Sequence, residues 1–161
     1  MQRFYRVLAN SLVASVVNTF VWFAVTFWIY LETRSVIATS VMAGIYTVTV
    51  ALSGFLLGTI VDRFPKKAAM LASSLASLAL YVAAAGIYAA FPTDAFRHVA
   101  SAPLWAFVLL TLLGAIAGNL RGITLSTLVT VLVPADRRDR ANGLVGTANG
   151  VAFLAASIFS G

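Results

Sequence analysis

One arginine lies deep inside an apolar stretch of the sequence. Arg121 stands ~18 Å along a helix from Val133, where the apolar stretch ends. If this stretch crosses a bilayer, an arginine at that depth costs ~2.5–3.5 kcal/mol. No Asp or Glu occurs inside any apolar segment of the chain, so no buried carboxylate of its own can offset that cost. Two explanations stay open: the side chain snorkels to the cytoplasmic interface, or it faces a water-filled cavity and meets an anionic substrate group or an acid from a missing part of the protein.

A second set of polar residues lies in the first apolar run. Ser11, Ser15, Asn18 and Trp22 are three or four positions apart, so they share roughly one helix face. Asn18 is near the middle of the run, where its amide can bond another helix for ~0.6 kcal/mol on average. Helix packing and substrate contact are equally open for Asn18, and Trp22 can line a pocket or pack. With Arg121, these two are the candidates for a substrate pathway.

A third set is a charged segment between two apolar runs, where a short cytoplasmic loop would lie. Its members are Gly58, Asp62, Arg63, Lys66 and Lys67. Charges in such a loop fix how a membrane protein is oriented. They can also hold one helix against another.

The remaining residues give no enzyme, metal or cofactor site. Asp94, Asp136 and Asp139 lie in the connections, and no glycine-rich phosphate loop occurs. The chain has no cysteine, and its only histidine is His98, so disulfides and His-cluster metal sites are excluded. The net charge is +6, but the basic residues form short caps between apolar runs and no stripe that nucleic acid would need. We expect a protein without enzyme activity, metal or cofactor, with the lipid bilayer as its environment.

The composition indicates that these residues belong to a membrane protein. Hydrophobic residues make up 61% and charged residues 10% of the chain, whereas soluble domains have about 45–50% and about 25%. A spanning helix needs roughly 20 apolar residues, and the runs lack the alternation of barrel strands. The sequence predicts an all-α membrane protein with about five transmembrane helices, at residues 7–30, 36–61, 68–91, 104–133 and 144–161.

The distribution of basic residues predicts the orientation. Short cytoplasmic loops carry an excess of Lys and Arg. One side of the predicted bundle holds only Arg34 and Arg97, and the other side holds eight basic residues: Arg3, Arg6, Arg63, Lys66, Lys67, Arg137, Arg138 and Arg140. We therefore expect a multi-pass protein of the plasma (inner) membrane with a cytoplasmic N-terminus.

Small residues recur at helical spacing in three of the predicted spans. Gly54 lies in the second span, Gly114 and Gly118 in the fourth, and Gly146 and Gly150 in the fifth. In lipid, small residues let helix backbones approach closely. These glycines are predicted helix-packing positions, and some of these faces can also slide or rock.

The charged segment resembles a motif of the major facilitator superfamily of secondary transporters. That motif has the pattern Gly-x-Leu-Ala-Asp-Arg-x-Gly-Arg-Lys-x-x-Leu. Here Pro65 replaces the second glycine, and the matching positions are Gly58, Asp62, Arg63, Lys66, Lys67 and Met70. The resemblance implies part of the N-terminal six-helix half of a major-facilitator fold. It also implies that Asp62 and Arg63 belong to a latch that holds the two halves in the outward-facing state.

Two other segments resemble the drug and siderophore export branch of that family. Val133–Gly143 is similar to its loop between helices four and five, and Thr33–Ser35 to its first outer loop. Arg121 is similar to its helix-four arginine, although Leu125 stands where a glycine is usual, and no proline follows Pro134. The resemblance implies an exporter of small molecules that works by alternating access.

The last apolar run reaches Gly161 without a polar flank. We expect residues 1–161 to be a partial N-terminal transmembrane domain, truncated in helix five, that lacks its C-terminal half. The alternative is a complete small membrane protein that acts as an oligomeric or partner-binding module.

Overall fold

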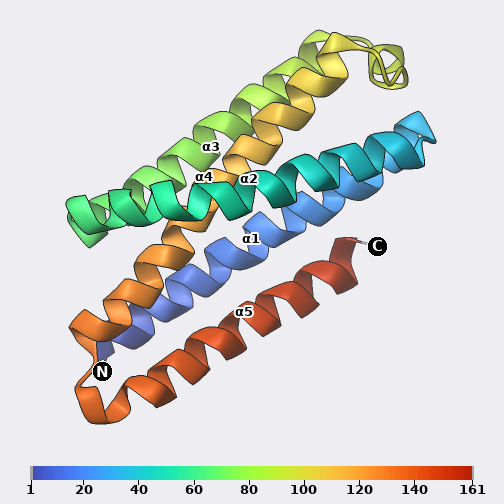
Figure 1. Ribbon diagram of the computed structural model, residues 1–161. Helices are drawn as coiled ribbons and strands as arrows, with labels where there is room; N and C mark the ends of the chain where they lie inside the picture. Colours follow the sequence, from blue (N-terminus) through green and yellow to red (C-terminus); the bar gives the residue numbers. More distant parts are fainter. Residues whose placement is uncertain (1, 161) are drawn as a thin grey trace.

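The computed structural model describes residues 2–160, and this part of the chain is a bundle of long helices (Figure 1). Two short 3-10 turns, η1 (Thr93–Phe96) and η2 (Ala135–Arg137), lie in the connections. The five long helices are α1 (Gln2–Thr33), α2 (Val36–Arg63), α3 (Lys66–Ala90), α4 (Ala102–Leu132) and α5 (Arg138–Ser160). The expected all-α fold with five long apolar helices is confirmed.

Local chemistry explains where the helices begin and end. Ser35 caps α2, because its Oγ accepts a hydrogen bond of 3.1 Å from the Ala38 amide. Arg34 has a φ of 50°, which turns the chain sharply between α1 and α2. Pro65 precedes α3, and Pro103 occupies the first turn of α4, where a missing amide proton costs nothing.

Two helices begin earlier than their apolar runs predict. α1 begins at Gln2 and not at Val7, and α5 begins at Arg138 and not at Leu144. Helical hydrogen bonds need no apolar side chains, so polar residues continue a helix beyond the membrane core. An apolar run therefore marks the spanning part of a helix and not its ends.

Helix α4 is the centre of the bundle. It packs against α1, α2 and α3, while α5 lies along α1 (Figure 1). The main apolar core is formed by buried residues from four elements: Val25, Ile29, Ala38, Met42, Phe96, Leu104, Val108 and Leu112. Because α4 is covered on several sides, it is the most buried of the five long helices in the described chain.

The outer faces of the bundle suit lipid. On α3, Leu71, Leu75, Leu78 and Val82 are exposed and are spaced three or four residues apart, so they form one apolar stripe. Phe55 on α2 is 81% exposed. All five long helices of the described chain have the length and composition needed to cross a membrane. The protein is thus a multi-pass membrane protein.

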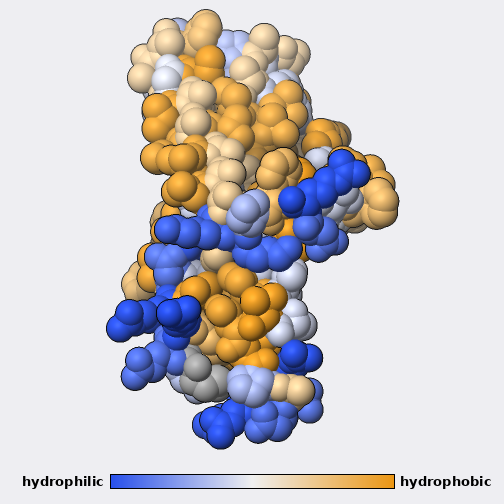
Figure 2. Space-filling model, turned by 90° about the vertical axis from the view of Figure 1, so that its left-hand side faces the viewer, coloured by the Kyte–Doolittle hydropathy of each residue, from blue (hydrophilic) through white to orange (hydrophobic). Residues whose placement is uncertain are grey.

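Hydrophilic residues gather at one end of the bundle. The N-terminus, the α2–α3 connection and the α4–α5 connection all lie at the left of Figure 1. Figure 2 looks onto this end and shows blue hydrophilic groups across its middle and lower parts, with apolar surface above them and an apolar patch between them. We call this surface the basic end. It carries Arg3, Arg6, Arg63, Lys66, Lys67, Arg137, Arg138 and Arg140.

Candidate functional site

A pocket of about 550 Å³, lined by both polar and apolar side chains, lies between α1, α3, α4 and α5. Asn18 of α1 and Arg121 of α4 line it, together with Asn149 of α5. Serines of α3 form part of its wall, and no Asp or Glu is among its lining residues. Two of the three residues expected on a substrate pathway therefore share one cavity.

Asn18 joins three helices at this pocket. Its Nδ2 donates to the carbonyl oxygen of Ala115 on α4 at 3.1 Å. The hydroxyl of Tyr81 on α3 donates to Asn18 Oδ1 at 2.7 Å. Both polar ends of the amide are thus used within the protein, which fixes the side chain. Asn18 lines the pocket as a positioned group that ties α1 to its neighbours.

Helix α3 contributes polar residues that the sequence analysis did not select. Ser73 donates to the Ala117 carbonyl at 2.7 Å, and Ser77 donates to the Gly114 carbonyl at 2.8 Å. Together with Tyr81 they stand four residues apart, so they line one face of α3 against α4. The four-residue spacing of these residues is the sequence signal for this helix face. The signal is weak, because serines are common in apolar helices.

Two of the predicted packing glycines lie where helices meet closely. A Cβ on Gly118 would stand 2.6 Å from Asn18 Oδ1, and a Cβ on Gly114 would stand 2.6 Å from a ring carbon of Tyr81. Nothing lies within 4 Å of the corresponding position at Gly54, Gly146 or Gly150. The packing role of these three stays a prediction.

Arg121 reaches from α4 across to α3. One terminal nitrogen, Nη1, donates to Ser74 Oγ at 2.6 Å, and Ser74 in turn donates to the Met70 carbonyl at 3.1 Å. The Nε atom of Arg121 is buried and has no hydrogen-bond partner within residues 2–160. No ion pair in this part of the chain includes Arg121. The pocket therefore has one positive charge and no negative one.

Trp22 lies outside the residues that line the pocket. Its ring packs against Tyr46 of α2 with the centroids 5.5 Å apart, and against Phe23 at 5.0 Å. Its Nε1 is buried without a partner among the described residues. The contact with substrate that we expected for Trp22 stays a prediction.

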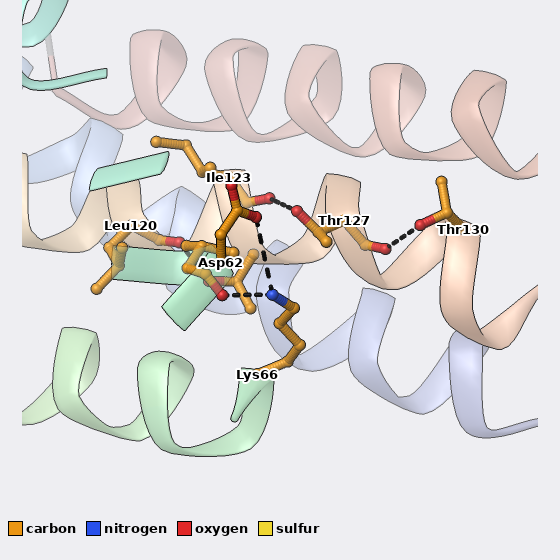
Figure 3. Close-up of polar contacts among 8 residues, drawn as sticks. Asp62, Lys66, Leu120, Ile123, Thr127 and Thr130 are labelled. Carbon is orange, nitrogen blue, oxygen red and sulfur yellow. Dashed lines mark hydrogen bonds and ion pairs between the residues drawn. The ribbon is translucent and has the colours of Figure 1, made fainter. Parts of the chain in front are cut away.

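The charged segment spans the end of α2 and the start of α3, so Gly58, Asp62 and Arg63 are helical and the connection itself is only residues 64–65 (Figure 3). Lys66 Nζ lies 4.0 Å from Asp62 Oδ1 and also donates to the Val61 carbonyl. The Asp62 side chain is 80% exposed, so this ion pair contributes little to stability. Thr127 and Thr130 of α4, drawn in the same view, bond carbonyls of their own helix. The side chains of Arg63 and Lys67 are exposed and make no ion pair or hydrogen bond within residues 2–160.

One of the comparisons with known proteins identifies a family for the chain. The family model described as Major Facilitator Superfamily matches residues 7–161, which is nearly the whole chain. No curated protein and no solved structure matches it. The match covers all five long helices and includes the charged segment. The chain therefore belongs to the major facilitator superfamily, a family of membrane transporters.

Proposed function

We propose that the chain supplies the first five helices of a secondary-active exporter of small molecules, of the drug or siderophore type. The observation that carries this proposal is that Asn18 and Arg121 line one pocket inside an apolar bundle. Ionisable residues within membrane spans are costly and mark substrate or ion pathways. A volume of about 550 Å³ also suits a small organic ligand.

The mechanism we propose is alternating access. In this family two six-helix halves rock around a site near the middle of the bilayer. The pocket would be one wall of that site, and the C-terminal half would supply the opposite wall. The hydrogen bonds of Asn18, Tyr81 and Ser77 join α1, α3 and α4, which favours their moving as one body. Export, and not uptake, is favoured by the resemblance of Thr33–Ser35 and Val133–Gly143 to the export branch.

The test is transport by the complete transporter that contains this chain, reconstituted in liposomes with an imposed ion gradient. A panel of drugs and siderophores is offered, and saturable export that stops when the gradient is collapsed is the expected result. The 161-residue chain alone should insert and not transport, since a pathway needs two facing halves. Saturable export by the chain alone would favour the alternative of a complete small membrane protein. Export that is indifferent to every gradient would contradict secondary-active transport.

The orientation gives a first prediction. The chain has no cysteine, so single cysteines can be labelled without background. In intact cells an impermeant thiol reagent should label Thr93→Cys, next to η1, and should not label Ala135→Cys at the basic end. The physical reason is the excess of Lys and Arg at the basic end. Permeabilised cells, in which both cysteines should react, are the control. The opposite labelling pattern would reverse the topology.

The charged segment gives a second prediction. Asp62→Asn in the complete transporter should strongly reduce export with little change in membrane abundance, because it removes the negative charge of the proposed latch. Asp136→Asn is the matched control, since Asp136 is also exposed, at the same end, and pairs only with its neighbour Arg137 at 3.6 Å. Export and surface abundance are measured for both variants. Wild-type export by Asp62→Asn at equal abundance would remove the latch assignment.

A further inference from the structure

The guanidinium of Arg121 lacks the partner that a cation in this position needs. It has one hydrogen bond, to the neutral hydroxyl of Ser74, and a buried Nε without a partner. We propose that the pocket binds the anionic group of an organic substrate, a carboxylate or a group of like charge, through Arg121. This inference rests on the proposed function, because it names the substrate class of the same pocket.

The other polar groups of the pocket cannot neutralise Arg121. Ser73, Ser77 and Tyr81 donate their hydroxyl protons to protein oxygen atoms, so these groups are committed to holding helices together. The carbonyl groups of Ala115 and Gly114 are likewise used by Asn18 and Ser77. On the α3 and α4 side, the pocket therefore has neutral groups that are held in place and one cationic group, Arg121, that is available for a ligand.

The acidic residues of the chain also lie away from it. The five are Glu32, Asp62, Asp94, Asp136 and Asp139, all at helix ends or in connections. The four ion pairs within residues 2–160 join four of these acids to Lys66, Arg97 or Arg137, and none of the four includes Arg121. Arg121 is therefore the one formally charged residue that lines the pocket, and at a protein surface charges interact more strongly than in bulk water. An anion is attracted, a neutral molecule less so, and a cation is repelled.

The shape of the guanidinium group indicates which anionic group of the substrate would bind. Arginine presents a planar fork of donors that matches the two oxygen atoms of a carboxylate or phosphate. Ser74 occupies Nη1, and the buried Nε needs an acceptor. A carboxylate bound at this fork would satisfy the orphan donor and neutralise the charge in a single contact. A cationic drug would do neither.

The charge inside the pocket can be measured directly, because the chain is free of cysteine. Asn149→Cys places a thiol on the exposed part of the pocket wall. The full chain in lipid nanodiscs is treated with methanethiosulfonate reagents of opposite charge, sulfonatoethyl and trimethylammonioethyl. The ratio of the two rates reports the local charge, because any change in thiol ionisation cancels in the ratio. Thr93→Cys, exposed in the connection between α3 and α4, is the reference thiol.

The expected result is a ratio, anionic over cationic, that is roughly tenfold higher at Asn149→Cys than at Thr93→Cys. Arg121→Gln should remove this preference, and Arg121→Lys should keep most of it because the charge is retained. The Thr93→Cys rates in each background, with size-exclusion profiles, check that the variants fold alike. Equal ratios at the two thiols, or a preference that survives Arg121→Gln, would overturn the proposal.

A second measurement compares two ligands of similar shape and different charge. Benzoate and benzamide differ in charge but little in size, so only benzoate should slow the reaction of Asn149→Cys with an uncharged methanethiosulfonate. Protection by both, or by neither, would contradict anion binding. The complete transporter is then measured in the same way. If Asn149→Cys still prefers the anionic reagent there but no export is found, only the export proposal fails. If export is found but this preference is absent, a carboxylate of another helix neutralises Arg121, and only the anion proposal fails.

Discussion

Gly118→Ala is expected to destabilise the bundle by about 2 kcal/mol, although it adds only one methyl group. The new Cβ would stand 2.6 Å from Oδ1 and 2.9 Å from Cγ of Asn18. Asn18 cannot move aside cheaply, because its amide is held by Ala115 of α4 and Tyr81 of α3. Either α1 shifts away from α4, or both hydrogen bonds are lost, each worth about 0.6 kcal/mol in a membrane protein.

The chain offers a matched control one turn along the same helix. Gly122 also lines the pocket, but nothing lies within 4 Å of a Cβ built on it. Gly122→Ala should be neutral or slightly stabilising, since alanine is the better helix former. The measurement is unfolding of the full chain in detergent or nanodiscs, followed by helical circular dichroism. Equal stability of the two alanine variants would show that Gly118 does not require its missing side chain.

A double-mutant cycle separates this clash from a general effect of α4. Asn18→Ala removes the side chain that Gly118 faces, so adding Gly118→Ala to it should cost much less than adding it to the natural chain. The difference is the coupling free energy between the two positions. A coupling near zero would contradict the contact between Asn18 and Gly118.

The fold could be predicted well because a bilayer limits the backbone structures that can cross it. Each apolar run had to be a helix, since every backbone polar group in lipid needs a partner within the protein. Pro65, Pro103 and Pro134 then fixed the breaks. Helix ends were less predictable, because hydropathy identifies only the part of a helix that lies in lipid. Helix α5, for example, begins with the polar residues Arg138 and Asp139, which precede its apolar run.

The site could be predicted only in part, because spacing identifies a helix face without identifying its neighbour. Gly118 and Asn18 were both selected, but their direct contact depends on how α1 crosses α4. Tyr81 was missed, because one tyrosine in an apolar run has no pattern of its own until its hydroxyl meets Asn18. Trp22 was selected from its spacing with Asn18, yet the ring packs on Tyr46 of α2.

The second large effect concerns transport. In the complete transporter that we propose, Arg121→Gln is expected to lower kcat/KM for the proposed anionic substrate by roughly thirtyfold or more, because removing one partner of a buried charge pair costs about 2 kcal/mol or more. Arg121→Lys should recover part of this loss, since lysine keeps the charge without the planar fork. Arg137→Gln is the control: Arg137 is exposed at the basic end and pairs only with the adjacent Asp136.

The reason to expect an effect on transport, and not only on folding, is the way Arg121 is held. Its single hydrogen bond goes to Ser74, so glutamine in its place removes little of the packing that joins α3 to α4. That packing depends on Ser73, Ser77 and Tyr81, which Arg121→Gln leaves untouched. Membrane abundance and unfolding should therefore stay close to those of the natural chain while export falls. If abundance falls in step with export, Arg121 is a structural residue; if export of anionic and neutral substrates falls equally at normal abundance, Arg121 acts in the transport cycle without selecting charge.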